Sequence, residues 1–305
     1  MSLAPLVLFT YNRPHLLKRT IEALSKNYLA SQTALFIFSD APKKDESPQN
    51  VFEVRKFVKT ISGFKSLSIV ERKESYGLAK SVISGVTEVI KDYGKVIVLE
   101  DDLISSPNFL NFANASLDKY ENEKNVFSIA SYTYQLDIPQ DFNYDNYFTP
   151  RCESLGWGTW INRWEKVDWE VKDIMSFLDS KVSRKKFSEG GDDLIDMIVK
   201  QMAGKLDSWA VRWCYAHYKN NALCSYPVIS KIAHIGVDKM GTHVKKEEKL
   251  LDTKLDDSGK ISFNLIEKPF VNSSILMQYK KYFKRNLLKK LKREVQILLL
   301  KRKLK

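Results

Sequence analysis

Three consecutive carboxylates, Glu100, Asp101 and Asp102, follow directly on an apolar run at residues 96–99. The run is short, unbroken and rich in β-branched residues, which predicts a strand buried on both faces. The acids would then stand at the carboxyl end of the strand, where open α/β sheets bind ligands. Adjacent carboxylates repel each other unless a cation is near, and hard divalent cations prefer oxygen ligands. The pattern favours a metal site, with an acidic turn before the next helix as the alternative.

The first predicted strand, at residues 6–9, leads into a polar turn. This turn carries Thr10, Tyr11, Asn12 and Arg13, and a proline then begins a helix with a regular apolar face. A cation in such a turn is suited to meeting a phosphate. An exposed surface arginine is the alternative interpretation of Arg13.

Two further strand ends carry polar groups. The predicted strand at residues 35–38 is followed by Asp40, which could accept hydrogen bonds from a nucleobase or ribose, or cap the next segment. Gly77 begins a helix whose N-terminus favours anions. Lys80 lies in the first turn of that helix, facing either an anion or solvent. The order of elements up to residue 102 predicts half of a doubly wound sheet.

The second half of the chain is rich in aromatic residues. Four tryptophans fall within residues 157–169, and indole rings suit sugar stacking as well as core packing. Trp157 and Gly158 are expected in a loop that approaches a ligand or turns sharply. Asp207 stands at or near the start of a helix, where a capping role is the alternative to chemistry. His234 and His243 are expected in a mobile loop.

Composition narrows the class of protein. The 305 residues are 44% hydrophobic and 28% charged, with a net charge of +12. Residues 278–305 account for +11 of that charge, so the body is close to neutral and no nucleic-acid partner is expected. Three cysteines match no zinc or disulfide pattern. With no signal peptide and no membrane-spanning run, we expect a cytoplasmic chain.

The C-terminal segment, residues 276–305, predicts a basic amphipathic helix. An apolar stripe at steps of three and four is flanked by lysine and arginine. Such a helix is typical of a segment that lies on an anionic membrane surface. A helix packed on its own domain, or on a second copy of the chain, is the alternative. We expect a peripheral protein at the inner face of the cell membrane.

Several of these motifs together resemble the GT-A fold of nucleotide-sugar glycosyltransferases, over residues 4–245. The chain resembles bacterial family-two-like sugar transferases and is similar to the Golgi N-acetylglucosaminyltransferase that initiates complex N-glycan branching. The motifs are Thr10-Tyr11-Asn12-Arg13-Pro14, Ser39-Asp40, Leu99-Glu100-Asp101-Asp102-Leu103, Leu155-Gly156-Trp157-Gly158, Leu206-Asp207-Ser208-Trp209 and the loop at 235–243. The resemblance implies an α/β fold with a central mixed sheet flanked by helices. It divides the chain into a nucleotide-sugar-binding half (1–120), an acceptor-binding half (121–270) and the tail (271–305).

The resemblance also implies roles for individual residues. Asp102 would bind Mn²⁺ or Mg²⁺ at the donor diphosphate, and Glu100 and Asp101 would hold ribose and sugar hydroxyls. Asp207 would be the catalytic base, with inversion at the anomeric carbon. The remaining residues that would contact the nucleotide sugar are Thr10, Tyr11, Asn12, Arg13, Asp40, Gly77 and Lys80. The residues that could contact the donor or the acceptor are Trp157, Gly158, His234 and His243.

The predicted function is therefore metal-dependent transfer of a sugar from a nucleotide sugar, with UDP as the expected nucleotide. The expected acceptor is a hydroxyl of a glycan or lipid-linked glycan in surface polysaccharide biosynthesis. Two alternatives stay open. One is a sugar nucleotidyltransferase, and the other is a non-catalytic carbohydrate-binding or scaffold protein on a transferase body.

Overall fold

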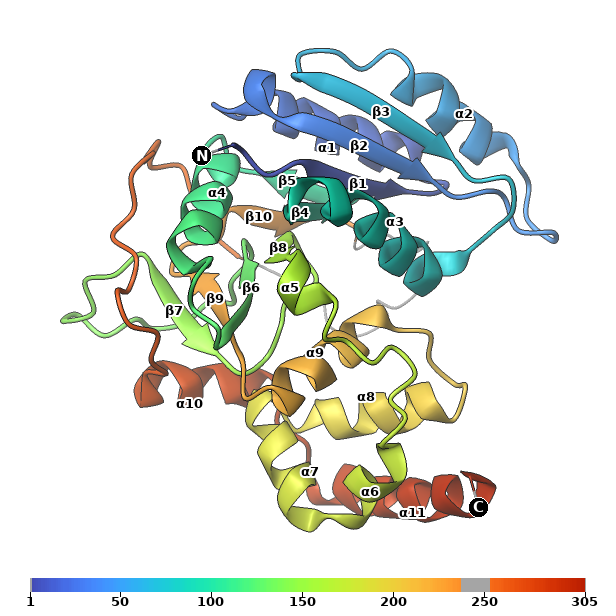
Figure 1. Cartoon of the computed structure of the whole chain (residues 1–305), viewed down its shortest axis with the longest axis vertical. Coiled ribbons are helices and arrows are strands. Elements are labelled where there is room, and N and C mark those ends of the chain that lie inside the picture. The colour runs from blue at the N-terminus through green and yellow to red at the C-terminus, as the bar shows by residue number, and fades with distance from the viewer. Residues whose placement is uncertain (1, 237–252, 305) are drawn as a thin grey trace.

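The strand that ends in the three carboxylates, β4 (Lys95–Glu100), lies inside an eight-stranded sheet of order β3-β2-β1-β4-β8-β6-β9-β7 (Figure 1). This computed structural model describes residues 2–236 and 253–304. Strands β1 to β4 are parallel, as the alternation of strands and helices predicts. The other strands of this half are β1 (Leu6–Thr10), β2 (Ala34–Ser39) and β3 (Ser66–Glu71).

The second half of the sheet is mixed. Strand β8 pairs antiparallel with both β4 and β6, β9 is parallel to β6, and β7 closes the edge antiparallel to β9. These strands are β6 (Val126–Ala130), β7 (Asn146–Thr149), β8 (Trp157–Trp160) and β9 (Leu223–Pro227). A separate two-stranded antiparallel sheet joins β5 (Leu103–Ser105) to β10 (Ile232–His234). The prediction of a mixed α/β sheet is confirmed.

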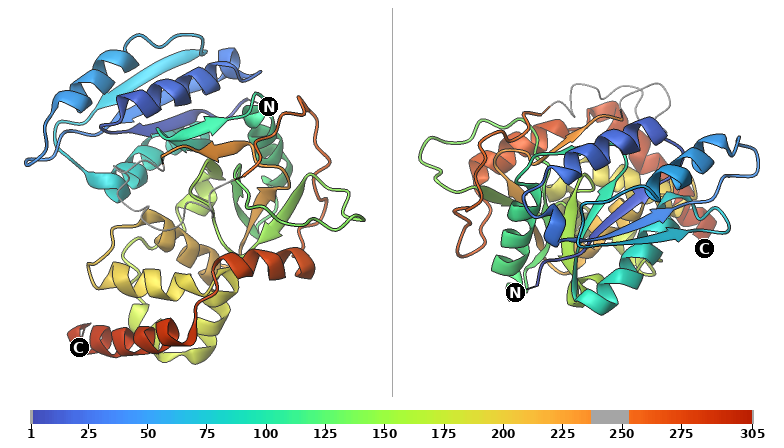
Figure 2. Two further views of the ribbon diagram at one scale, coloured as in Figure 1. Left: turned by 180° about the vertical axis from the view of Figure 1, so that it is seen from behind. Right: turned by 90° about the horizontal axis from the view of Figure 1, so that it is seen from above.

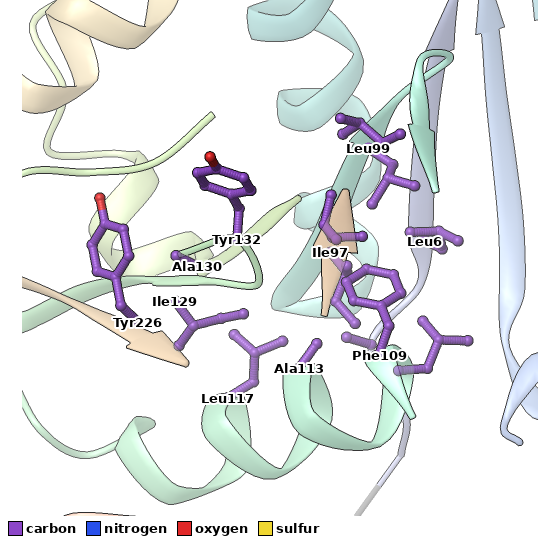
Figure 3. Packing of buried hydrophobic residues seen from close by; sticks show 14 of the residues in the cluster. Leu6, Ile97, Leu99, Phe109, Ala113, Leu117, Ile129, Ala130, Tyr132 and Tyr226 are labelled. Carbon is purple, nitrogen blue, oxygen red and sulfur yellow. The ribbon is translucent and has the colours of Figure 1, made fainter. Parts of the chain in front are cut away.

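The side chains of β4 divide between two apolar cores because neighbouring residues of a strand point to opposite faces. Ile97 and Leu99 belong to the core that also contains α4, and Figure 3 shows Ile97 beside Phe109. Val96 and Val98 belong to the other core, together with α3. The helices of this half are α1 (Pro14–Ser25), α2 (Gln49–Val58), α3 (Gly77–Tyr93) and α4 (Phe109–Tyr120).

A group of short helices packs below the mixed half of the sheet (Figure 1). They extend the core that contains α3, through residues such as Phe177, Leu194 and Trp213. The helices are α5 (Ile161–Trp164), α6 (Ile174–Asp179), α7 (Lys181–Phe187), α8 (Asp193–Met202) and α9 (Trp209–Lys219). Two short 3₁₀ helices lie at Ala30–Gln32 and Ser188–Gly190.

The expectation of a loop at Trp157 and Gly158 is wrong, because both residues belong to strand β8. The Trp157 side chain is 1% exposed and stacks on the indole of Trp209, with ring centroids 4.9 Å apart. A Cβ at residue 158 would lie 2.8 Å from the carbonyl oxygen of Val96. The glycine is therefore explained by close contact between two strands, and the indole by core packing.

The C-terminal segment forms two helices where the sequence predicts one continuous stripe. Helix α10 (Ser273–Tyr282) ends before Phe283, and α11 (Leu287–Leu304) follows after a short break. Tyr279 of α10 is fully buried and its hydroxyl lies 2.9 Å from that of Tyr226, so α10 is part of the body. In the described part of the chain, no helix combines the length and apolar character needed to cross a membrane.

Candidate active site

The Asp101 carboxylate is fixed by the ends of two parallel strands. Because β1 and β4 pair in register, the turn after β1 lies beside the turn after β4. The Thr10 hydroxyl and the Tyr11 backbone N–H both donate to Oδ2 of Asp101, at 2.8 and 3.1 Å. Thr20 of α1 donates to the Asp101 carbonyl oxygen at 2.9 Å. Three segments of the chain thus position a carboxylate that is only 2% exposed.

Arg13 bridges two of the three carboxylates. One of its terminal nitrogens lies 2.7 Å from Oδ1 of Asp101, and the other lies 2.7 Å from Oδ2 of Asp102. Burial lowers the pKa of the guanidinium, but the adjacent negative charges outweigh this and raise it above its ordinary value. Arg13, in the turn after β1, therefore supplies a positive charge that the adjacent carboxylates need.

Asp102 is also held by the segment around β10. The Nε2 atom of His234 lies 3.3 Å from Oδ2 of Asp102, and the Ile235 N–H donates to the Asp102 carbonyl oxygen at 2.9 Å. A Cβ at Gly236 would lie 2.5 Å from Oδ2 of Asp102, so this contact requires glycine. Burial raises the pKa of Asp102, but the bond to His234 and the charge of Arg13 outweigh burial and lower it.

His234 was expected in a loop, but it ends strand β10 and pairs there with Leu103. This places its imidazole next to Asp102, and its Nδ1 is buried with no hydrogen-bond partner in the described part of the chain. The described residues contain no group of three or more His, Cys, Asp or Glu side chains arranged around a metal position. His243 and most of the predicted loop at 235–243 lie outside the described residues.

A divalent cation fits this donor set. Asp102 and His234 offer one carboxylate and one imidazole, a combination suited to Mn²⁺, and such ions take their other ligands from water and substrate phosphates. Oδ1 of Asp102 receives no hydrogen bond from residues 2–236 or 253–304, since Arg13 and His234 both contact Oδ2. Two protein ligands plus a diphosphate would complete such a site.

Glu100 lacks the pairing that stabilises its two neighbours. Burial, followed by the charges of Asp102 and Asp101, raises the pKa of Glu100 to about 8, and Arg13 opposes this only in part. A carboxyl group with that pKa is largely protonated at neutral pH. It can therefore donate a hydrogen bond to a hydroxyl or ether oxygen of a ligand as well as accept one.

The Asp40 carboxylate is occupied by the segment that begins α3. Its oxygens accept hydrogen bonds from the backbone N–H groups of Ala41, Tyr76 and Gly77 at 2.9–3.0 Å. The Ser75 hydroxyl adds a fourth bond at 3.1 Å. These contacts join the end of β2 to the start of α3. The alternative was a cap on the next segment after Asp40, whereas the observed bonds hold the start of α3, 36 and 37 residues further along the chain. The predicted contact of Asp40 with a base or ribose stays a prediction.

Asp207 lies immediately before α9 but does not cap it. Ser208 is the capping residue, since its hydroxyl accepts from the Val211 N–H at 3.3 Å. The Asp207 side chain is 65% exposed, with Oδ1 3.6 Å from Arg212. A Cβ at Gly77 would lie 3.8 Å from Oδ2 of Asp207. The fold thus brings a solvent-facing carboxylate from the second half of the chain to the start of α3.

A cavity of about 780 Å³ lies between α3 and the start of α9. Its lining includes Asp207, Arg212 and Lys80, whose ammonium also lies 3.9 Å from the centre of the Tyr76 ring. Glu100, Asp101 and Asp102, at the end of β4, do not line this cavity. Apart from Trp157 and Gly158, which belong to strand β8, and His243, which lies outside the described residues, the predicted site residues form two clusters. One surrounds Asp101 and Asp102, and the other surrounds the start of α3.

Sequence reasoning missed Glu46 beside the first turn. The Tyr11 hydroxyl donates to Oε2 of Glu46 at 2.6 Å, and the Asn12 amide lies 3.5 Å from the same oxygen. Burial and this hydrogen bond raise the pKa of Tyr11 to about 12. Glu46 lies in a polar connection without hydrophobic periodicity, so no local signal identified it.

A parallel half-sheet that continues into a mixed half, with carboxylates at the end of β4, defines a GT-A-like fold. The sequence profile described as glycosyl transferase family 2 matches residues 6–164, more than half of the chain. The chain belongs to this family and is a glycosyltransferase. The part of the resemblance that concerns bacterial family-two-like transferases is confirmed at the level of the family. The resemblance to the Golgi N-acetylglucosaminyltransferase stays a prediction.

Several solved structures are similar in fold. S. aureus TarS, residues 1–349, has a TM-score of 0.43 and 13% identity, over 77% of this chain and 61% of that one. Mannosyltransferase PcManGT from Pyrobaculum calidifontis, in complex with GDP-Man and Mn²⁺, has a TM-score of 0.39 and 12% identity. The match covers 72% of this chain and 71% of that one. The Q189E mutant of LgtC has a TM-score of 0.36 and 9% identity, and the match covers 57% of this chain and 65% of that one. No curated protein matches the chain by sequence.

Proposed function

We propose that this glycosyltransferase moves a sugar from a nucleotide-sugar donor, with UDP as the first nucleotide to test, to a hydroxyl of a glycan or lipid-linked glycan. The reaction would require Mn²⁺ or Mg²⁺ and would invert the anomeric carbon. The donor would bind to the half formed by residues 1–120 and the acceptor to the half formed by residues 121–270. Surface polysaccharide biosynthesis is the expected setting.

One observation carries the proposal. Arg13 and His234, from two different segments of the chain, both contact Oδ2 of Asp102, at the carboxyl end of a central parallel strand. Ligands of open α/β sheets bind at that edge. The arrangement leaves Oδ1 of Asp102 for a cation and places a guanidinium beside it, which suits a nucleoside diphosphate.

Asp102 and His234 are the residues that would hold the metal ion. When bound, the ion would act as a Lewis acid on the diphosphate oxygens and stabilise the charge that develops on them. Arg13 would contribute a second positive charge at the same edge. Glu100 would form a hydrogen bond with a hydroxyl of the donor.

Asp207 would act as the general base. The acceptor hydroxyl oxygen forms a bond to the anomeric carbon, its proton passes to the Asp207 carboxylate, and the bond from that carbon to the diphosphate breaks. The nucleoside diphosphate leaves with the electron pair. Two features support this role. Ser208 already caps α9, so the Asp207 carboxylate has no capping function. The adjacent Trp209 is 2% exposed and fixes the backbone at this point.

The test is a panel of nucleotide sugars, assayed for thermal stabilisation and for donor hydrolysis with Mn²⁺, with Mg²⁺ and with a chelator. A ligand that binds the folded state raises its apparent stability. Asp102→Asn should abolish metal-dependent stabilisation by the donor, and Asp207→Asn should keep it but lose transfer. Asp257→Asn, at an exposed position, is the matched control.

If no nucleotide sugar stabilises the protein with metal and none is hydrolysed, the carbohydrate-binding scaffold becomes the better explanation. Transfer of a nucleotidyl group in place of a sugar would favour the nucleotidyltransferase. Transfer that survives Asp207→Asn at the wild-type rate would remove that residue from the mechanism.

A further inference from the structure

Helix α11 is attached to the body through its charged side. Lys290 lies 2.8 Å from Asp192, and Arg293 lies 4.0 Å from Asp196 of α8. The Arg293 guanidinium also donates to the Asp192 carbonyl oxygen at 3.2 Å. Further pairs join Glu294 to Arg184 and Lys301 to Asp179. Only Ile297 and Leu300 of α11 are buried.

The apolar side of α11 faces away from the body. Its members are 56–80% exposed: Leu287, Leu288, Leu291, Val295, Leu298 and Leu299. At 100° per residue they form one continuous face, opposite the row of Lys290, Arg293 and Ile297. A helix at a protein surface normally buries its apolar face and exposes its charged one. Here the orientation is reversed, which indicates that something other than the body covers the apolar face.

Cations line one long side of this face and its C-terminal end, and Glu294 borders the other side. Lys292 and Lys303 are adjacent to the face at helical spacing, Lys289 lies further round the helix on the same side, and Arg302 stands at the C-terminal end. All four are exposed, and within residues 2–236 and 253–304 no acid forms an ion pair with any of them. The other cations of α11 are already used in attachment. The face therefore presents apolar side chains and uncompensated positive charge together.

We propose that this outward face of α11 lies on an anionic lipid surface. A helix of this kind lies in the plane of the interface, with its apolar side among the acyl chains and its cations at the lipid phosphates. A second copy of the chain fits less well. A two-fold dimer would place the face against itself and bring four cations against the same four. Anionic lipid satisfies both the apolar and the charged groups.

The attachment of α11 also orients the molecule. In Figure 1 and in the left view of Figure 2, α11 lies at one end of the molecule, and β2, β3 and α2 lie at the other. With α11 on the lipid, the strands of the first half would lie at the end of the molecule far from the membrane, and α6 and α8, which contact α11, would lie at the near end. A lipid-linked molecule would then meet the second half of the chain first.

The test is flotation of the full chain with vesicles, and it requires no donor or acceptor. The vesicles are phosphatidylcholine alone, or phosphatidylcholine and phosphatidylglycerol in equal parts. We expect binding only to the anionic vesicles. Lys289→Gln/Lys292→Gln should weaken binding about 25-fold, at about fivefold per basic residue. Lys26→Gln/Lys124→Gln, which removes the same charge from other exposed positions, should bind like the wild type.

A second pair of variants tests the apolar contact. Leu291→Ser/Leu298→Ser should lose binding, whereas Phe52→Ser/Ile261→Ser, which changes exposed apolar residues elsewhere, should keep it. These positions are exposed, so none of the variants should unfold. Equal flotation of the wild type and the Leu291→Ser/Leu298→Ser variant would overturn the proposal. The proposal would also be overturned if the wild type does not bind anionic vesicles but forms a dimer, and if the Leu291→Ser/Leu298→Ser variant is a monomer.

The outcome is independent of the proposed chemistry. A protein that binds anionic vesicles but transfers no sugar would contradict the proposed function and support the lipid contact. An active protein that never floats would do the reverse.

Discussion

The guanidinium of Arg13 lies 2.7 Å from Oδ2 of Asp102, a residue that follows it by 89 positions in the chain. Parallel pairing of β1 with β4 causes this meeting, because it brings the turns after the two strands together. The contact neutralises part of a cluster whose negative charges would otherwise repel. It also means that Arg13 and a metal ion would act on the same carboxylate.

Replacing Arg13 should therefore destabilise the protein and increase its dependence on metal. Arg13→Gln removes both ion pairs and leaves two buried carboxylates uncompensated, at a cost of about 3 kcal/mol in the free energy of unfolding. Mn²⁺ should restore part of this stability, since a cation can replace the lost charge. Urea denaturation with and without Mn²⁺ measures both effects.

Lys43→Gln is the matched control, because the exposed pair of Lys43 and Glu46 should contribute less than about 1 kcal/mol. An Arg13→Gln protein as stable as this control would show that the bridge does not stabilise the fold.

Glu100 should make stability depend on pH. Its pKa of about 8 in the folded state exceeds the ordinary value of 4.5, so between these values the folded protein binds a proton that the unfolded chain has released. Stability should then fall as the pH rises through this window, by up to about 1.4 kcal/mol per pH unit. The glutamine side chain of Glu100→Gln is uncharged at every pH in this window, so the stability of that variant should depend less on pH.

Denaturation midpoints from pH 5 to pH 9 provide the measurement for Glu100. The exposed replacement Glu22→Gln should leave the wild-type slope unchanged. Parallel profiles for the wild type and Glu100→Gln would mean that Glu100 is ionised in the folded protein.

The sequence was sufficient for the parallel half of the fold. Unbroken β-branched runs predict strands such as β4, because a strand covered on both faces needs apolar residues at every position. The position of Asp102 at the edge of the sheet follows from the same pattern. Partners from distant segments could not be predicted in this way. His234 reaches Asp102 only because β10 pairs with β5, and no local pattern specifies that pairing.

Glycines and amphipathic helices were interpreted less accurately, for a physical reason. Gly158 has the sequence context of a loop, but a neighbouring strand excludes its Cβ. The apolar stripe of α11 was predicted correctly, whereas its orientation depends on Asp192 and Asp196, at and within the start of α8, which the sequence of α11 itself does not reveal. Local periodicity describes one face of an element and leaves its partner unspecified.

His234 should affect metal binding more than folding. His234→Gln keeps a side chain of similar polarity but removes the imidazole nitrogen. Loss of a group that only supports a ligand typically lowers metal affinity about 10–100-fold, so loss of a proposed ligand should lower it at least as much. The concentration of Mn²⁺ that gives half-maximal donor stabilisation should rise accordingly. Asp207→Asn is the comparison, since it changes the proposed base and should leave that concentration unaltered. The same shift in both variants would indicate a general loss of structure.

Gly236→Ala should damage the same site by steric contact. The added Cβ would lie 2.5 Å from Oδ2 of Asp102, the oxygen that also contacts Arg13 and His234. Because those contacts hold the carboxylate in place, it must move, and we expect destabilisation of about 1–3 kcal/mol together with weaker Mn²⁺ binding. Gly158→Ala, which would meet the backbone of β4, should destabilise the fold without a specific change in metal affinity. Calorimetric Mn²⁺ titration of both folded variants separates the two cases, and unchanged Mn²⁺ affinity in Gly236→Ala would exclude Asp102 as the ligand.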